Sequence, residues 1–285
     1  MKSLEELATI DTSIISDLVP KIILDKVEEA ARARRFGRNL VKINEDLVRT
    51  KGREILVGRR TVLAAGAVSE GASLKGTVDA GTLTYSASTI HPTKIGTHCG
   101  ITQESIEGCE LNLIRDGITE AGIALAQKED MDIITALLGS SNTINAEEHG
   151  TWSLNAYGVI TAAVTAIKGA KWVPKFLVVH PDALKGILLS TMFIDASKYG
   201  SNEPILSGEI GKVAGLKVLV TTNIGDPTEA IVIDSDRAAW MAIRRHVDMK
   251  RWDNPDTDSI ELYFYMEYGV ELTDEEACVR ITNIS

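Results

Sequence analysis

The residues of this chain that could do chemistry form no known catalytic or metal-binding pattern. His91, His98 and Cys99 lie close together in the sequence. Neighbouring residues of a strand point to opposite faces, so His98 and Cys99 are poorly placed to share one ion, and we interpret all three as structural or surface residues. The sequence contains no HExxH, GxSxG or Cys–His signature. We therefore expect no enzyme, no catalytic or cofactor-binding residue, no metal ligands and no cofactor.

Two loops resemble ligand-binding motifs only in part. GEIGKVAG, at 208–215, places Gly-Lys before Val213 where the phosphate-binding loop needs Ser or Thr. A strand follows it, as after a turn, whereas a dinucleotide-binding loop leads into a helix. The acidic segment around Asn254 lacks the glycine and the terminal glutamate of a calcium loop. We interpret both segments as turns.

The cysteines and arginines of the sequence do not indicate a disulfide framework, a zinc site or a dedicated nucleic-acid-binding surface. Cys99, Cys109 and Cys278 are an odd number without CxxC spacing, which favours buried free thiols. A basic cluster near the N-terminus is either the solvated face of a helix or a weak, non-specific phosphate contact. The net charge of −10 and the pI of about 5.1 argue against a dedicated DNA-binding protein. The cluster comprises Arg32, Arg34, Arg35 and Arg38.

Length and composition set the scale of the fold that must position these groups. The 285 residues, 44% hydrophobic and 25% charged, suit one large or two modest globular units. The sequence has no apolar run long enough to span a membrane and no signal-peptide pattern at its start. We therefore expect a protein that stays in the cytoplasm where it is made.

The N-terminal region predicts an arm and not a domain. KIILDKVEEAARARR, at 21–35, has the apolar spacing of a helix, and Gly37 is placed to cap its C-terminus. From Gly52 onwards, two β-rich segments at 54–63 and 82–89 flank a glycine-rich stretch with few large apolar residues. The segments predict a long hairpin, which needs a neighbour because an isolated two-stranded hairpin is barely stable in water.

A strand and an unusually long helix follow the hairpin. KIGTHCGI, at 94–101, alternates as a strand, with Ile95 and Ile101 on one face. Thr102 is placed as the N-cap of a helix that runs to Leu138 and ends at Gly139. The helix would have about 36 residues and a length of roughly 54 Å. Its apolar residues recur on more than one face, so it needs packing partners along its length.

The remaining sequence predicts an α/β region and a closing sheet. Helices are expected at 154–169 and 181–191, and buried strands at 175–181 and 229–235. The C-terminal part alternates cleanly from Ile260 to Glu267, which indicates a half-exposed antiparallel sheet.

This order of parts resembles the major capsid proteins of tailed phages and related archaeal viruses, which share the Hong Kong 97-type fold. The local likeness lies in GREILV at 52–57, KIGTHCGITQESIEG at 94–108, VVHPDALKGIL at 178–188, GEIGKVAGLKVLVTTNI at 208–224 and SIELYFYMEYGVEL at 259–272. No single motif is specific, and the weight comes from order and spacing across about 20–285. The resemblance implies the α+β capsid fold.

The resemblance also implies a division of the chain. An N-terminal arm would cover 1–51, an extended β-hairpin loop 52–92, and a peripheral domain with the spine helix (about 102–138) 93–150. An axial α/β domain would cover 151–235, and a second peripheral segment 236–285.

On the same resemblance, the chain is a structural subunit of a virion, assembled in the host cytoplasm. It would form pentamers and hexamers of an icosahedral capsid around double-stranded DNA, with the extended loop lying across a neighbouring subunit. Portal, scaffolding or decoration proteins are further expected partners, as is weak contact with packaged DNA; a membrane is not. Scaffolding would be a separate protein or a segment already removed. By analogy, a Lys75–Asn254 cross-link is an open question.

Two alternatives remain open from the sequence. An encapsulin-like nanocompartment would use the same fold to hold a protein cargo. A cytoplasmic α/β enzyme would form a small oligomer around a pocket of titrating groups that motif searches miss.

Overall fold

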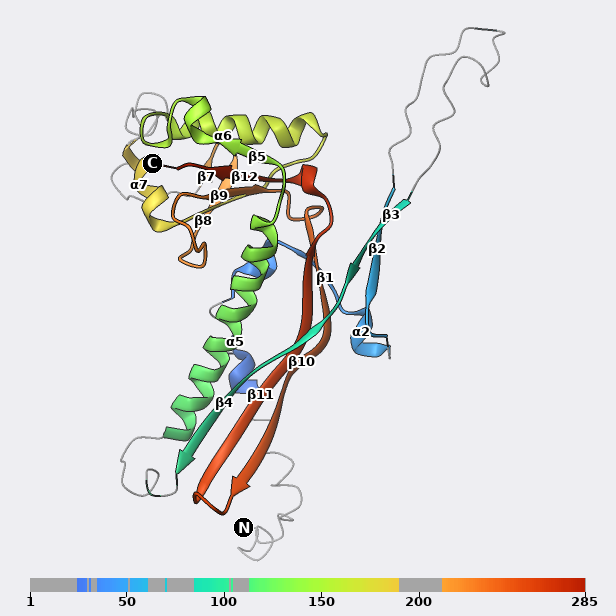
Figure 1. Ribbon diagram of the computed structural model, residues 1–285, viewed down its shortest axis with the longest axis vertical. Helices are drawn as coiled ribbons and strands as arrows, with labels where there is room; N and C mark the ends of the chain where they lie inside the picture. The colour runs from blue at the N-terminus through green and yellow to red at the C-terminus, as the bar shows by residue number, and fades with distance from the viewer. Residues whose placement is uncertain are drawn as a thin grey trace, which may run out of the picture.

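One long helix joins two sheets that together form an α+β protein, as the sequence predicts (Figure 1). An upper unit contains a six-stranded sheet and two helices. Below it the long helix lies along a four-stranded sheet, and a two-stranded hairpin projects to one side. The computed structural model describes residues 25–29, 31, 35–50, 52–60, 70, 85–102, 104, 113–189 and 212–284.

The four-stranded sheet has the order β1-β10-β11-β4 and is antiparallel except for its first pair. β10 (Ala239–Asn254) and β11 (Ser259–Leu272) form its long central hairpin, and β4 (Thr93–Thr102) pairs with β11 over its whole length. Leu262, Phe264 and Met266 are buried. The predicted alternation is confirmed, except that Tyr265 on the opposite face is also buried.

The long helix α5 (Leu113–Leu138) packs on β4 and β11 and ends immediately before Gly139, as predicted. Thr102, the predicted N-cap, is the last residue of β4, and an extended backbone at this position is compatible with an N-cap. Glu104 is helical, and 105–112 lie outside the described residues. Ile118, Leu125 and Ile133 are buried on different turns. The helix therefore has packing partners along its described length.

The arm reaches α5 through a few short elements. Residues 25–29 and 31 are helical, and Val27 is fully buried in the main core. The 3₁₀ helix η2 (Gly37–Asn39) follows, then β1 (Lys42–Asn44) beside β10 and the short helix α2 (Asp46–Arg49). Gly37 starts a new turn, so the prediction that it caps the preceding helix is wrong.

The upper unit is the α/β region predicted from the sequence. Its sheet has the order β5-β12-β9-β6-β8-β7, and α6 (Trp152–Gly169) and α7 (Pro181–Leu189) pack together on it. Trp152 is buried between them and donates its indole N–H to the Ala183 carbonyl over 2.7 Å. The strands are β5 (Thr143–Asn145), β6 (Phe176–Val179), β7 (Lys212–Val213), β8 (Leu216–Val220), β9 (Ala230–Ile233) and β12 (Cys278–Thr282).

Two strands from outside the expected axial range belong to this sheet. β5 pairs in parallel with β12, and β12 pairs antiparallel with β9. The expected boundaries of the axial domain, at 151 and 235, separate both strands from the sheet that they complete. The C-terminal strand thus ties the end of the chain to the upper unit.

The predicted hairpin begins with β2 (Ile55–Arg60) and β3 (Tyr85–Ile90), which form a separate two-stranded sheet. Figure 1 shows it leaving the body beside α2. Of 61–84, the structure describes only Glu70. Among the described residues, no helix is long and apolar enough to cross a membrane.

Candidate assembly interface

The root of the hairpin is fixed on one face and exposed on the other. Leu47, Ile90 and Ala242 form a small buried cluster, against which Ile55 and Val57 pack. Leu56 points the other way, because successive strand residues alternate, and 65% of it is exposed. The hairpin base therefore presents an apolar side chain to solvent next to a firmly held root.

A cluster of charges joins the arm to the middle of α5. The Glu129 side chain is fully buried and faces two arginines. Arg38 donates from Nε and from Nη2 to the two carboxylate oxygens, the second over 3.1 Å. The Nε of Arg35 lies 3.2 Å from Oε2 of Glu129, and 5% of the Arg35 side chain is exposed. One helix carboxylate thus holds two arm guanidinium groups.

Asp130, the next residue of α5, holds the arm backbone. Its Oδ1 accepts the Gly37 N–H over 2.8 Å, and its Oδ2 accepts the Phe36 N–H over 3.3 Å. A Cβ on Gly37 would lie 2.7 Å from Oδ1 of Asp130, so the approach requires glycine. Burial raises the pKa of Asp130 above its usual range, although the two backbone N–H donors lower it.

Arg35 and Arg38 have a role that neither sequence interpretation foresaw. Both pair with Glu129, and 5% of the Arg35 side chain and 26% of the Arg38 side chain are exposed, so neither lies on a fully solvated helix face. Burial lowers the pKa of Arg35, and the Glu129 carboxylate partly offsets this. Arg32 and Arg34 lie outside the described residues. Sequence reasoning missed Glu129 and Asp130 because nothing local links an acidic pair in a helix to arginines some 90 positions earlier.

The C-terminal end of α5 is anchored to β12. Arg280 donates from Nη1 to the Leu138 carbonyl over 3.2 Å and from Nη2 to Glu229. The Ser140 hydroxyl donates to the Cys278 carbonyl over 3.1 Å, and the Cys278 thiol lies 3.7 Å from the Leu137 carbonyl. These contacts satisfy carbonyls that a helix end leaves without intrahelical partners. They connect the long helix rigidly to the upper sheet.

The histidines and cysteines singled out in the sequence do not converge. His98 stacks on Tyr263 with ring centroids 5.6 Å apart, and His91 faces Glu54 at 3.5 Å. Cys99 lies on the other face of β4, half-buried against α5. Within the described ranges, no group of three or more His, Cys, Asp or Glu side chains could hold a metal ion.

The two loops that resemble ligand-binding motifs occupy turns where they are described. Ala214 and Gly215, at the end of the glycine-rich segment, form the turn between β7 and β8. Asn254 ends β10, and its side chain accepts the Asp256 N–H over 3.0 Å. Lys75 lies outside the described residues, so the cross-link with Asn254 stays untested.

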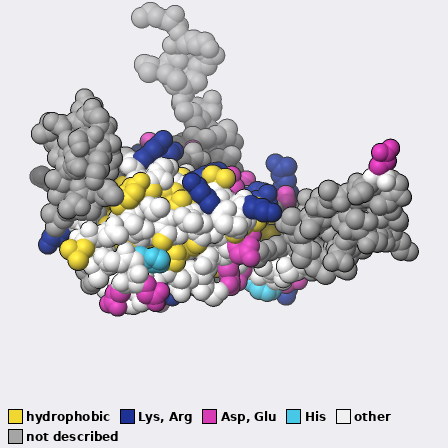
Figure 2. Space-filling model, turned by 90° about the horizontal axis from the view of Figure 1, so that it is seen from above, with side chains coloured by type: hydrophobic (Ala, Val, Ile, Leu, Met, Phe, Trp, Pro, Cys, Tyr) yellow, Lys and Arg dark blue, Asp and Glu magenta, His cyan; other side chains and the backbone are white. Residues whose placement is uncertain are grey.

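The upper unit also exposes apolar side chains. Figure 2 shows hydrophobic side chains across its visible face, with basic residues mainly along one long side and acidic residues mainly along the other. Leu154 on α6 is 76% exposed, and Val173 and Val220 are also exposed. Unlike charges on opposite sides suit copies that meet side by side.

Comparison with known proteins agrees with this architecture. The curated major capsid protein of Staphylococcus phage phiMR11 is 27% identical over 192 residues, which cover 66% of each chain. Residues 86–281 match the model of a family described as phage capsid protein.

Solved structures share the fold. A structure from Mycobacterium phage Che8 superposes with a TM-score of 0.70 at 15% identity, covering 87% of this chain and 90% of that one. The capsid structure of cyanophage P-SCSP1u gives a TM-score of 0.71 at 12% identity, covering 87% and 88%. The Hong Kong 97-type fold expected from the order of elements is thereby confirmed. Since the family model covers more than half of its length, this chain belongs to the phage capsid protein family, as a structural protein of the virion shell.

Proposed function

We propose that this capsid protein self-assembles into pentamers and hexamers of an icosahedral shell that encloses double-stranded DNA, and that it has no enzymatic role. The observation that carries the proposal is the β2–β3 hairpin, which pairs with no third strand among the described residues and keeps Leu56 exposed. A two-stranded ribbon of this kind needs a surface to lie on. The surface would be a neighbouring subunit.

The upper unit supports a ring arrangement. Its acidic and basic sides lie opposite each other in Figure 2, so identical copies related by rotation would bring unlike charges together at each contact. The axial domain would then include β5 and β12 in addition to 151–235, because these strands complete its sheet. The peripheral domain would comprise α5 and the four-stranded sheet.

Electron microscopy of the purified protein tests self-assembly directly. Rings or closed shells are expected as the protein concentration rises; persistent monomers or dimers at every concentration would contradict the proposal. Nucleic acid inside particles from infected cells is expected, whereas a protein cargo would indicate the nanocompartment alternative. Co-purification would reveal portal, scaffolding or decoration partners.

The hairpin has a separate test. Deleting 65–81 should leave a soluble, folded subunit that forms no stable shells. Leu56→Asp should also reduce shell yield, with little effect on subunit unfolding because the side chain is exposed. Leu56→Ile keeps the apolar surface and serves as the matched control. An unchanged shell yield for both the deletion and Leu56→Asp would remove the role assigned to the hairpin.

A further inference from the structure

The contact between the arm and α5 differs in kind from the rest of the core. The described core around it is apolar, whereas Glu129 and Asp130 are among its few buried charged groups. Placing charges in a protein interior costs desolvation energy that ion pairing only partly recovers. The polar contact between the arm and α5 is therefore specific in geometry but contributes little net stability.

Hydrogen bonding of the cluster is incomplete. The Nη2 atom of Arg35 is buried without a hydrogen-bond partner, and Nε lies near Glu129 without hydrogen-bond alignment. Burial also disfavours the charged forms of both Arg35 and Asp130. A buried donor without a hydrogen-bond partner costs free energy, so it lowers the stability of the closed contact between the arm and α5.

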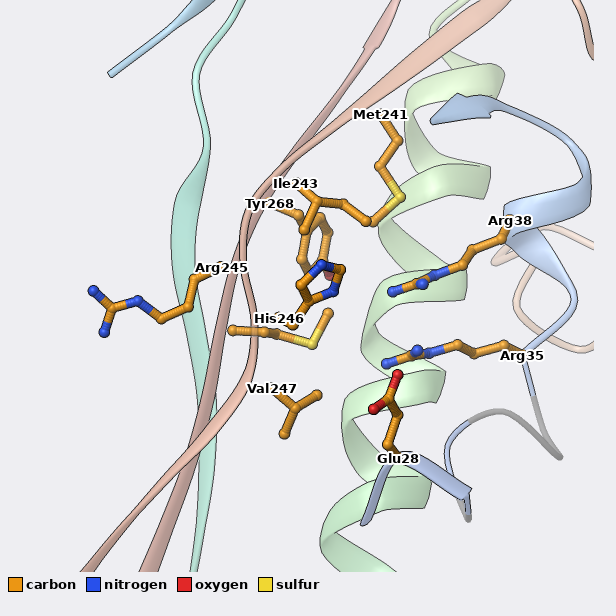
Figure 3. A pocket seen from close by; sticks show the side chains of 10 residues that line it. Glu28, Arg35, Arg38, Met241, Ile243, Arg245, His246, Val247 and Tyr268 are labelled. Carbon is orange, nitrogen blue, oxygen red and sulfur yellow. The ribbon is translucent and has the colours of Figure 1, made fainter. Parts of the chain in front are cut away.

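A narrow cleft adjoins the cluster. Figure 3 shows Arg35 and Arg38 extending from the arm toward Tyr268 and Ile243, with α5 behind them. The cleft has Glu28, Arg35 and Arg38 on the arm side and residues of β10 and β11 on the other. The β-side lining consists of Met241, Ile243, Arg245, His246, Val247, Met266 and Tyr268.

We propose that the Arg35–Arg38–Glu129–Asp130 cluster is a polar latch, and that residues 35–39 detach from α5 at this latch while Leu40, the helix and both sheets stay in place. Opening would expose the cleft lining, which includes Met241, Ile243 and Met266, to solvent. The chain from Leu40 reaches β1 and then α2, whose Leu47 packs under Ile90. Leu40 and Val41 are buried in the main core between the latch and β1, so opening frees the arm ahead of Leu40 and leaves the hairpin root in place.

Hydrogen exchange of the unassembled full-length subunit, followed by mass spectrometry, tests the latch without requiring shells. The amides of Phe36 and Gly37 should exchange about tenfold or more faster than those of Leu262 to Met266, because local opening requires less free energy than global unfolding. Glu129→Gln removes the shared charge and keeps the shape. It should accelerate exchange of 35–39 by roughly a further tenfold and leave β11 unchanged.

Lys128→Gln is the matched control, since Lys128 is the preceding residue, is half exposed and pairs with Asp132 on the helix surface. It should leave exchange of 35–39 unchanged. If Glu129→Gln fails to fold, Arg38→Lys keeps the charge but loses the paired donors, and should accelerate the same segment. Equal acceleration of 35–39 and β11, or no acceleration of either, would show a single cooperative unit and overturn the latch.

Discussion

Single residues show how burial changes the role of a side chain. Arg35 and Arg38 read as surface residues in the sequence, because arginine is seldom buried. Both instead meet Glu129, which lies on another element and is fully buried. Arginine is compatible with either a surface position or a buried ion pair, and the position of Glu129 determines which of the two forms here.

Cys278 provides a pH-dependent measurement of core integrity. Burial raises the pKa of its thiol to about 12, while a hydrogen bond with Ser140 lowers it. The folded pKa exceeds that of the unfolded chain, about 8.5. The stabilisation is therefore complete below about pH 8.5 and is lost as pH rises toward 12.

We expect the free energy of unfolding in urea to fall by up to about 1.4 kcal/mol per pH unit above pH 9 through this residue. Cys278→Ala should be less stable at pH 7, because it leaves a small cavity, but its stability should decline less steeply above pH 9. The readout is the slope of stability against pH. An identical slope in both proteins would contradict the assignment.

At the scale of elements, α5 is the axis to which other parts attach. The arm binds its middle through Glu129 and Asp130, β12 anchors its C-terminal end through Arg280, and β4 packs against its N-terminal part. Periodicity alone indicated that the helix needed several partners. It could not show that one of these contacts would be ionic.

Packing between α5 and β4 depends on Gly117. A Cβ at this position would lie 2.6 Å from the Cys99 sulfur and 3.7 Å from the Cys99 Cβ. Gly117→Ala should destabilise the subunit by about 1–3 kcal/mol through overpacking, despite the better helix propensity of alanine. Removing the sulfur with Cys99→Ala should restore most of that loss in the double variant.

A double-mutant cycle measured by urea unfolding checks this contact, with a coupling energy of about 1 kcal/mol or more expected. Gly58→Ala is a control, because nothing lies within 4 Å of a Cβ built there. Additive effects of Gly117→Ala and Cys99→Ala would show that the strand and helix do not meet in solution as described.

At the scale of the whole molecule, the net charge opposes assembly at long range, while exposed apolar residues favour it at short range. Each copy carries a net charge of −10, so identical subunits repel one another at long range. The exposed side chains of Leu56 and Leu154 supply short-range apolar surface that burial would stabilise.

Raising the salt concentration from about 50 to 500 mM should therefore lower the subunit concentration at which shells form, because the screening length falls from more than 10 Å to a few ångströms. Light scattering against protein concentration at each salt level gives this threshold. A threshold that rises with salt would mean that complementary ionic contacts between subunits outweigh the net repulsion.

The sequence by itself determined the elements and their order. Alternation in 94–101 and 259–272, the apolar runs of β6 and β9, and Gly139 after the long helix all fix local structure through side-chain periodicity and backbone preference. These patterns also carried the resemblance to the capsid fold. They act over a few residues, so one sequence sufficed to read them.

Only the tertiary structure decided the contacts between distant segments. These contacts join residues about 45 to 140 positions apart. β12 pairs with β9 and β5, Glu129 pairs with Arg35 and Arg38, and the Gly37 backbone donates to Asp130. Hydrogen bonds and ion pairs form wherever folding brings complementary groups together. Local periodicity does not predict which distant groups come into contact. The hairpin was foreseen because its two β-rich segments lie near each other in the sequence, whereas the charged cluster was missed because its partners are remote.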